Sequence, residues 1–508
     1  MSATPIGYAW MQEQLDAPDF LGSRRARVAA VQSLQRLPDG ALLVPAKLAP
    51  PQQWLDQALF AIKHEGVHLG YLAEAVRRID DASVIQAFVL TPNGTYLRKL
   101  CFLWEAMNGR TIAGLPDPSI KAAYVSMFDE GEYLVGASRR HPRWRVDFNG
   151  LGHLAFCPMV RRTPALQAAL KRGVLREASD FASSIGPQML DRALSWAYLS
   201  ETEGSYAIEG ETPSLDKTKL FARLLQRAHD QRELNEEYLV ELQNAITTNP
   251  FDKAVQFRTE QNRLQSHALG AAGVTYVPPE PDLSAELMQH LMHLANRRPP
   301  NVDALVHAAV VSFGFVLIHP FMDGNGRLSR FLVHHCLGQS GALPAGFLLP
   351  ISVAMKKHEQ RYLDALIAFS KPARALCDVT WAGDEHYSYQ WRANADIWFR
   401  TMDLTEGVQC MVDMAQTALD LHLKQEVEFL GLFDDVARHI NARHDLRGSD
   451  LATLIVSIYQ NGGRLSKNRR KRFAERVLPV VLDDIESTVA RRMKGVLLEE
   501  EEEEVGDD

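Results

Sequence analysis

The amino-acid sequence predicts a mainly α-helical fold, and three observations support this prediction. Apolar residues recur with the 3.6-residue period of a helix at residues 54–79 and 98–107. Residues 216–247 have the pattern of amphipathic helices. Two apolar stretches, residues 308–318 and 331–337, are suited to helices that are buried in a core.

Residues 1–195 are expected to form a separate N-terminal region that is mixed but mainly helical, and the sequence assigns it no role. Trp144 of this region lies within a cluster of basic residues, which are Arg139, Arg140, Arg143 and Arg145. The cluster could contact a nucleic acid or an acidic partner. We favour a surface strand or loop that packs one tryptophan, because a large aromatic side chain is usually well buried.

The twelve residues 319–330 connect the two apolar stretches and read HPFMDGNGRLSR. They are therefore expected to form a loop between two buried helices. The N-terminus of the second helix offers unpaired N–H groups and the positive end of a dipole, which favours phosphate binding. Gly324 and Gly326, on either side of Asn325, allow positive φ and a close approach of backbone N–H groups to an anion.

The other polar residues of this run fit phosphate chemistry as well. His319 ends the first helix, and its imidazole, with an ordinary pKa of about 6.5, can accept a proton from a hydroxyl near neutral pH. Asp323 offers the hard oxygen atoms that Mg²⁺ prefers. Arg327 and Arg330 are three residues apart, so both guanidinium groups project from one face of the second helix and match phosphate oxygens.

The run resembles the Fic motif, His-x-Phe-x-Asp/Glu-Gly-Asn-Gly-Arg-x-x-Arg, and matches it at every fixed position. Segments at residues 275–279, 349–352 and 361–363 resemble those that flank Fic cores. The resemblance implies a Fic-type helical core with a short β-hairpin flap, spanning residues 215–375.

The resemblance implies nucleotidyl transfer, most often of AMP from ATP to a Ser, Thr or Tyr hydroxyl of another protein. His319 would deprotonate this hydroxyl, and Asp323 would hold a Mg²⁺ ion that bridges the α- and β-phosphates. ATP and Mg²⁺ are thus the expected cofactors and a protein substrate the expected partner, with self-modification and homo-oligomerisation left open. The remaining fixed positions would bind the nucleotide: Gly324, Asn325 and Gly326 would line an anion hole, Arg327 would contact the β- and γ-phosphates, and Arg330 the γ-phosphate.

A short hairpin is expected at residues 270–279, because Gly270, Gly273 and Pro278-Pro279 supply turn signals. In Fic proteins such a flap holds the backbone of the target by strand addition, which needs no particular side chains. The candidate residues for this contact are Val274, Thr275 and Tyr276.

A second motif lies upstream, in residues 196–214. The segment Ser205-Tyr206-Ala207-Ile208-Glu209-Gly210 resembles the inhibitory motif of Fic proteins, Ser/Thr-x-x-x-Glu-Gly/Asn. Ser205 and Glu209 are four residues apart and share one helix face, and Gly210 is suited to end the helix. By the resemblance, Glu209 would pair with Arg330 and withhold it from the γ-phosphate, which would make the inhibition intramolecular.

Residues 376–495 are expected to be helical, and residues 496–508 to form a disordered acidic tail. A basic run lies within the helical region and consists of Arg464, Lys467, Arg469, Arg470, Lys471 and Arg472. Three interpretations of this run stay open. It is a solvated helix face, or it holds the acidic tail, or it contacts DNA, which we rank last.

The composition is ordinary for a soluble globular protein, with 46% apolar and 23% charged residues. No apolar run is long enough to span a membrane, and the N-terminus has no pattern of a secretion signal. The five scattered cysteines favour reduced thiols in the cytoplasm. Without the eight acids of the last ten residues, 55 basic residues face 55 acidic ones, so the body has no general attraction for nucleic acid.

Several alternatives to AMP transfer stay open. Some self-inhibited Fic proteins also remove AMP, so Glu209 is compatible with a deAMPylase or a bifunctional enzyme. Phosphate and phosphocholine transfer occur in relatives, although the intact Gly-Asn-Gly-Arg segment favours a nucleotide. A non-catalytic interaction protein or DNA-associated regulator would keep only a vestigial core, and the intact His319 and Asp323 favour the enzyme over this class.

Overall fold

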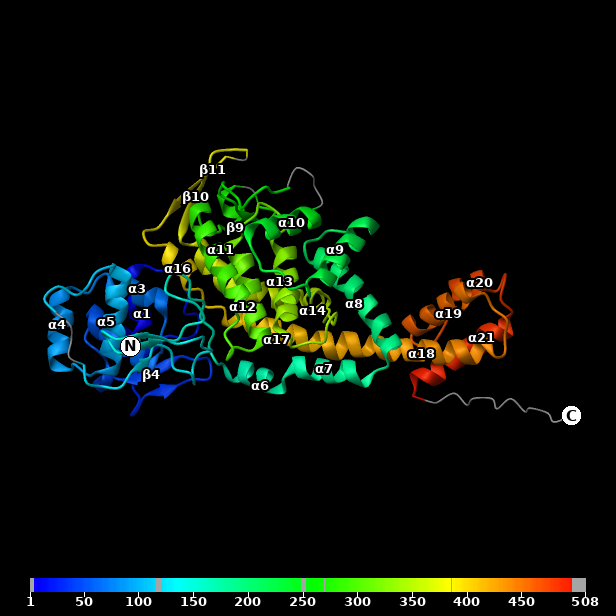
Figure 1. The fold of residues 1–508 in the computed structure, drawn as a ribbon, viewed down its shortest axis with the longest axis horizontal. Coiled ribbons are helices and arrows are strands. Elements are labelled where there is room, and N and C mark those ends of the chain that lie inside the picture. The colour runs from blue at the N-terminus through cyan, green and yellow to red at the C-terminus, as the bar shows by residue number, and fades with distance from the viewer. Residues whose placement is uncertain (1–3, 116–119, 248–252, 269, 385, 496–508) are drawn as a thin grey trace.

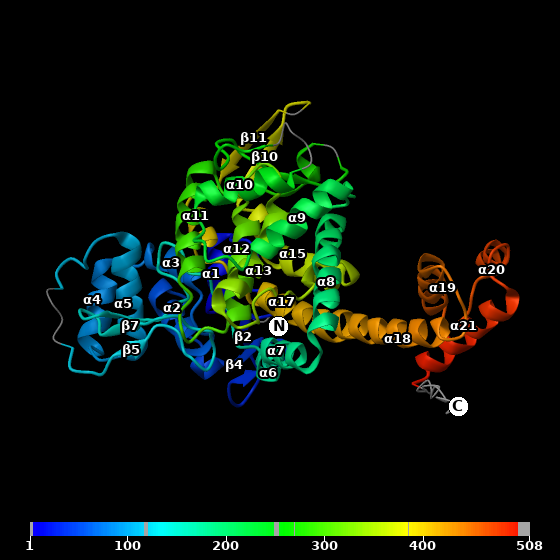
Figure 2. The same ribbon diagram turned by 45° about the vertical axis from the view of Figure 1, so that its right-hand side comes forward.

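A computed structural model describes residues 4–115, 120–247, 253–268, 270–384 and 386–495. The fold is mainly α-helical, as predicted, with short strands at its N-terminal end and near the top of the core (Figure 1). The N-terminal region lies on one side of a helical core, and a long helix carries a small C-terminal bundle away on the other side (Figures 1 and 2).

The centre of the core is an antiparallel pair of helices, α12 (Ala304–Ile318) and α13 (Asn325–Ser340). Almost every residue of α12 is buried, because apolar side chains surround it on all sides. Asp303 begins this helix by accepting hydrogen bonds from Leu305 N and Val306 N. Around the pair lie α8 (Pro187–Ile208), α9 (Leu215–Arg227), α10 (Glu236–Ile246), α11 (Pro281–Asn296), α14 (Ile351–Lys357), α15 (Glu359–Arg374) and α17 (Thr405–Thr417).

The N-terminal region combines helices with two small sheets. The first sheet has the order β1 (Pro5–Ile6), β2 (Ala26–Ala29), β4 (Leu42–Pro45) and β3 (Gln35–Arg36), in which only β2 and β4 are parallel. The second has the order β5 (Val125–Ser126), β7 (Val146–Phe148) and β6 (Arg139–His141). The helices are α1 (Tyr8–Leu15), α2 (Trp54–His64), α3 (Leu69–Val76), α4 (Asp81–Leu90), α5 (Thr95–Asn108), α6 (Pro164–Arg172) and α7 (Val174–Ser184).

One cluster of buried apolar side chains extends from Tyr8 to Leu423, so the N-terminal region and the core share a continuous interior. The division of the chain near residue 195 stays a prediction. The basic cluster around Trp144 has the favoured arrangement, because β6 and β7 flank this buried tryptophan and its Nε1 donates to Glu105 Oε2 at 2.6 Å.

The prediction of helices throughout residues 376–495 was wrong for the first residues of this region, which form a β-hairpin. There β10 (Cys377–Trp381) pairs antiparallel with β11 (Tyr387–Trp391). Both segments are rich in aromatic and β-branched residues with a two-residue alternation, which favours strands. The hairpin packs its apolar side chains against Val274 and Val277, which lie in and directly after β9 (Val274–Tyr276).

The rest of the C-terminal region is helical. After α16 (Asp396–Arg400) and α17, a π-helical turn (Ala418–Leu423) leads into α18 (Lys424–Asn441). This helix packs with α19 (Gly448–Gln460), α20 (Lys467–Phe473) and α21 (Pro479–Met493) around a separate apolar cluster. The structure describes no helix that is long and apolar enough to cross a membrane.

Most of the predicted basic run forms α20. Arg470 pairs with Asp483 and Glu486, both at 2.6 Å, and most of the other basic side chains are exposed. This arrangement fits a solvated helix face. The predicted acidic tail, residues 496–508, lies outside the described residues.

Candidate nucleotide-binding site

The loop between α12 and α13 begins with His319, in left-handed backbone geometry at φ 57°. The ring is buried, and its Nδ1 lies 3.1 Å from the carbonyl oxygen of Val316. A carbonyl only accepts hydrogen bonds, so this contact assigns the proton to Nδ1 and leaves Nε2 as the basic atom. Burial lowers the pKa of His319 to about 4. The imidazole is therefore neutral at physiological pH and able to accept a proton.

Arg258, which no motif of the sequence indicates, binds the backbone of this loop. Its Nε donates to the carbonyl oxygen of His319 at 2.8 Å, and its backbone N donates to that of Pro320 at 2.8 Å. Its Nη2 donates to the carbonyl oxygen of Pro279, near the flap. Burial lowers the pKa of Arg258 to about 10. A single arginine in an irregular segment has no sequence pattern that would have indicated this role.

Asn325 closes the loop on itself. Its Oδ1 accepts from Phe321 N at 3.0 Å, and its Nδ2 donates to Phe321 O at 2.8 Å. Both polar atoms of its side chain are therefore used to stabilise the loop. Only the backbone N–H of Asn325 remains to donate to an anion. Gly324 has φ 87°, a left-handed conformation that glycine adopts without strain, and it starts α13.

Arg330 is hydrogen-bonded to two residues of the predicted inhibitory segment on α8. Its Nε donates to Ser205 Oγ at 2.9 Å, and its Nη2 donates to Ser205 O at 2.7 Å and to Glu209 Oε1 at 2.8 Å. The Arg330 side chain is only 2% exposed, whereas that of Glu209 is 36% exposed. Burial opposes the charge of Arg330, but Glu209 outweighs it, and the pKa of Arg330 is raised.

The Glu209 carboxylate also lies directly over Gly326. A Cβ atom added at Gly326 would collide with Glu209 Oε1 and would come within 3.3 Å of Arg330 Nη1. Nη1 itself is buried without a hydrogen-bond partner. The Glu209 carboxylate thus occupies the space over Gly326 beside Arg330, which we call the anion seat. A glycine at the start of a helix next to an arginine is the kind of environment that binds a phosphate.

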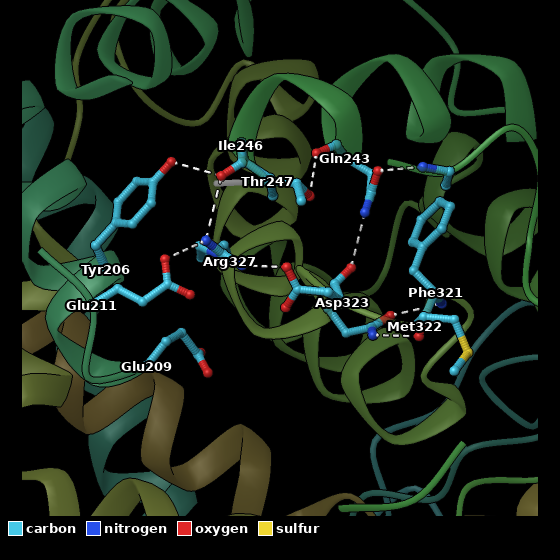
Figure 3. Close-up of polar contacts among 12 residues, drawn as sticks. Tyr206, Glu209, Glu211, Gln243, Ile246, Thr247, Phe321, Met322, Asp323 and Arg327 are labelled. Carbon is cyan, nitrogen blue, oxygen red and sulfur yellow. Dashed lines mark hydrogen bonds and ion pairs between the residues drawn. The ribbon is translucent and has the colours of Figure 1, made fainter. Parts of the chain in front are cut away.

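Arg327 is the other arginine of the motif, and its side chain is 1% exposed. Its Nη2 pairs with Asp323 Oδ2 at 2.9 Å, one turn earlier. Its Nη1 pairs with Glu211 Oε2 at 2.8 Å and donates to Ile246 O at 3.3 Å (Figure 3). Glu211 lies outside the fixed positions of the inhibitory motif, so no sequence pattern indicates this contact.

The structure brings Asp323 to the mouth of the same site, and its side chain is partly exposed. Its chemistry fits Mg²⁺, which is usually bound through one or two carboxylates together with phosphate oxygens and water. Among the described residues there is no group of three His, Cys, Asp or Glu side chains that could form a complete metal site.

The hairpin predicted at residues 270–279 begins earlier in the chain, because β9 pairs antiparallel with β8 (Leu264–Gln265), and only its second strand lies in the predicted range. Of its three candidate residues, only Thr275 is exposed. Val274 and Tyr276 are buried, and the Tyr276 hydroxyl donates to Leu317 O at 2.6 Å, next to the motif. These two side chains anchor the hairpin on the core, so any contact with a target would use the backbone or Thr275.

A buried hydrogen-bond network at Glu201 and a close backbone approach at Gly204 pack α8 tightly against the core and so position Glu209. Glu201 accepts from Ser352 N at 2.7 Å and Ser352 Oγ at 2.6 Å, and lies 2.7 Å from His334 Nε2. At Gly204 the helix approaches α14 so closely that an added Cβ would lie 2.9 Å from Val353 N. The helix that carries Glu209 therefore has one tightly defined position.

Replacing Gly204 by alanine is expected to destabilise the protein, although alanine is the better helix former by about 1 kcal/mol. The clash with the backbone of α14 costs about 1–3 kcal/mol, which is more than the gain in helix propensity, so the free energy of unfolding should fall. Urea unfolding measures the difference. Gly431→Ala in α18, where an added Cβ meets no atom within 4 Å, is the matched control and is expected to be stabilising. An increase in stability for Gly204→Ala would contradict the close packing of α8.

Comparisons with known proteins relate the segment that carries this site to a known family. Residues 233–337 match the model of the Fic/DOC family. The protein adenylyltransferase Fic of Aedes aegypti is 29% identical over 219 residues, which are 39% of this chain and 41% of that protein. The protein adenylyltransferase Fic of Drosophila grimshawi is 31% identical over 212 residues, 37% of this chain and 44% of that protein. The chain thus spans about two fifths of the length of the curated relatives it matches.

Solved structures of Fic proteins also align with the chain. A Fic family protein from Desulfovibrio desulfuricans aligns with a TM-score of 0.40 at 18% identity and covers 65% of this chain and 92% of its own. Fic-1 from C. elegans aligns with a TM-score of 0.34 at 16% identity, over 75% of this chain and 89% of its own. Residues 233–337, which contain the motif at residues 319–330, are thus similar to the Fic/DOC family.

Proposed function

We propose that the protein transfers AMP from ATP to the hydroxyl of a serine, threonine or tyrosine of a target protein. The observation that carries the proposal is the anion seat over Gly326, where the Glu209 carboxylate now lies against Arg330. The two relatives named protein adenylyltransferase support the same activity. The free and buried state of all five cysteines supports a reducing, cytoplasmic environment.

In the proposed reaction the target hydroxyl attacks the α-phosphorus of ATP. The new bond joins the hydroxyl oxygen to phosphorus, the bond to the β-phosphate oxygen breaks, and pyrophosphate leaves. Nε2 of His319 takes the hydroxyl proton, which its neutral state and its Nδ1 contact to Val316 allow. Arg258 keeps the imidazole in place by holding the His319 carbonyl.

The start of α13 would bind the triphosphate. The unpaired backbone N–H groups at this helix end would donate to an anion, and the buried arginines Arg327 and Arg330 would supply positive charge. When bound, Mg²⁺ would neutralise part of the charge on the α- and β-phosphates, with Asp323 as its carboxylate ligand. The protein contributes mainly position and charge, which is the usual basis of phosphoryl-transfer catalysis.

We further propose that Glu209 inhibits the reaction. Its carboxylate uses Nη2 of Arg330 and fills the space over Gly326, so a γ-phosphate and Glu209 compete for one place. Because α8 belongs to the same chain and packs on α14, this inhibition needs no partner.

Calorimetric titration of ATP into a Glu209→Gly variant tests the proposed nucleotide site. Binding is expected to be tighter with Mg²⁺ than without it, because Asp323 and a phosphate would share the ion. Asp323→Ala in the same background should remove the metal dependence and keep the weaker binding. A non-catalytic regulator would bind no ATP in a metal-dependent way, and that result would refute the proposed function.

A further inference from the structure

We infer that the inhibition uses a second carboxylate, because Glu211 blocks Arg327 in the way that Glu209 blocks Arg330. The inference rests on the proposed function, since it assigns to Arg327 a role in binding the triphosphate. Glu211 lies two residues beyond Glu209, in the short connection between α8 and α9, and its side chain is 32% exposed.

The turn at the end of α8 explains why the two carboxylates reach different arginines. Gly210 has φ 72° and donates to Ala207 O at 3.1 Å, and Glu211 N donates to Tyr206 O at 3.0 Å. This pair of bonds is the Schellman motif, in which a left-handed residue reverses the chain at a helix end. Glu209 therefore stays on the helix and meets Arg330, whereas Glu211 turns back and meets Arg327.

The surroundings of Arg327 leave few donors for a phosphate. Its Nη1 is used by Glu211 and by Ile246 O, and its Nη2 by Asp323, as Figure 3 shows. Only Nε is buried without a partner. The ring of Tyr206 lies 5.2 Å from the guanidinium carbon, and its hydroxyl donates to the same Ile246 carbonyl at 2.8 Å. The guanidinium is thus fixed in place, so a phosphate that approaches Nη1 has to displace Glu211.

The geometry makes the two carboxylates separable. Each pairs with a different arginine, and no atom of one arginine serves both acids in these contacts. The resemblance to the Fic motif implies that Arg327 contacts the β- and γ-phosphates and Arg330 only the γ-phosphate. Glu211 should therefore weaken the binding of both ADP and ATP, while Glu209 should weaken the binding of ATP alone. In a variant without Glu209, Glu211 still blocks Arg327, so the inhibition is only partly removed.

Calorimetry with Mg²⁺ tests this inference with ATP and ADP as separate ligands. The variants are Glu211→Gln, the shorter Glu211→Ser, Glu209→Gln and the double Glu209→Gln/Glu211→Gln. Both Glu211 variants are expected to bind ATP and ADP about tenfold more tightly than the unsubstituted protein, the change expected when one hydrogen bond between charged groups no longer competes. Glu209→Gln should tighten ATP binding only. Glu203→Gln, an exposed position on the same helix, is the matched control and should change neither affinity.

The outcomes separate the inference from the proposed function. If Glu209→Gln tightens ATP binding while both Glu211 variants leave ADP and ATP affinity unchanged, the role of Glu211 is refuted and the proposed function stands. If no variant, including the double one, binds ATP, the proposed function is refuted and the inference with it. In transfer assays the rate increases of the two single variants should multiply in the double variant, since the two contacts are independent.

Discussion

Replacing His319 by alanine is expected to abolish AMP transfer and to leave ATP binding intact. A positioned general base commonly contributes roughly 10²- to 10⁴-fold to a rate, and a methyl group accepts no proton. The imidazole contacts none of the described phosphate-binding side chains in a hydrogen bond, because its Nδ1 is used by Val316 O. Incorporation of labelled AMP in the Glu209→Gly background, together with ATP titration, measures both quantities.

The control for this substitution is alanine at His293, an exposed histidine on α11. That variant should keep full transfer. Continued transfer by the His319→Ala variant at the parent rate would remove His319 from the mechanism, whatever its ATP affinity.

The pH dependence follows from the same residue. Burial lowers the pKa of His319 from 6.5 to about 4, so the base stays neutral and the transfer rate should not fall on its account between about pH 7 and pH 5. The unfolded chain binds a proton near pH 6.5. Between that value and about pH 4 the unfolded state holds a proton that the folded state lacks, so His319 makes the protein less stable as the pH falls through this window.

Replacing Glu209 by glycine is expected to raise transfer by roughly 5- to 150-fold, the range of a coupling free energy of about 1–3 kcal/mol. The change frees Nη2 of Arg330 and the space over Gly326. The Ser205 contacts to the same guanidinium remain and keep it in place. The increase should be smaller than that of a variant that also lacks the Glu211 carboxylate.

The matched control is Glu203→Gly, which makes the same substitution at an exposed position of the same helix. It removes an equal charge and introduces an equally poor helix former without touching either arginine. An equal increase for both glycine variants would mean that loosening of α8, and not the loss of the Glu209 carboxylate, activates the protein. Equal low transfer by Glu209→Gly and the unsubstituted protein would refute inhibition by Glu209.

The sequence predicted the central part of the site because its signals are local. The apolar residues on both sides of the motif predicted the buried helices α12 and α13, and the Fic motif placed its eight fixed residues in one loop and the first turns of one helix. The contact between Glu209 and Arg330 joins residues 121 positions apart. No periodicity or spacing predicts such a pair, and only the resemblance to the family did.

Other residues of the site depend on contacts that have no sequence signature. Arg258 acts through carbonyl groups of distant segments, and Glu211 reaches Arg327 only because Gly210 reverses the chain. The hairpin β10–β11 was missed although its alternation was visible, because the flanking sequence on both sides favours helices. The burial of Val274 and Tyr276 also has no sequence signature, because it depends on which distant residues pack against them.

The most direct test of the central claim, a triphosphate seat at the start of α13 beside a histidine base, uses two labels. The Glu209→Gly variant is incubated with cell lysate and ATP that carries its label either at the α-phosphate or at the γ-phosphate. Label is counted above that of a lysate without the variant, because kinases in the lysate transfer the γ-phosphate. The account predicts that the variant adds protein label from the α-phosphate only, and that adding His319→Ala removes this added label. Added label from the γ-phosphate, or equal added α-label with and without His319, would contradict it.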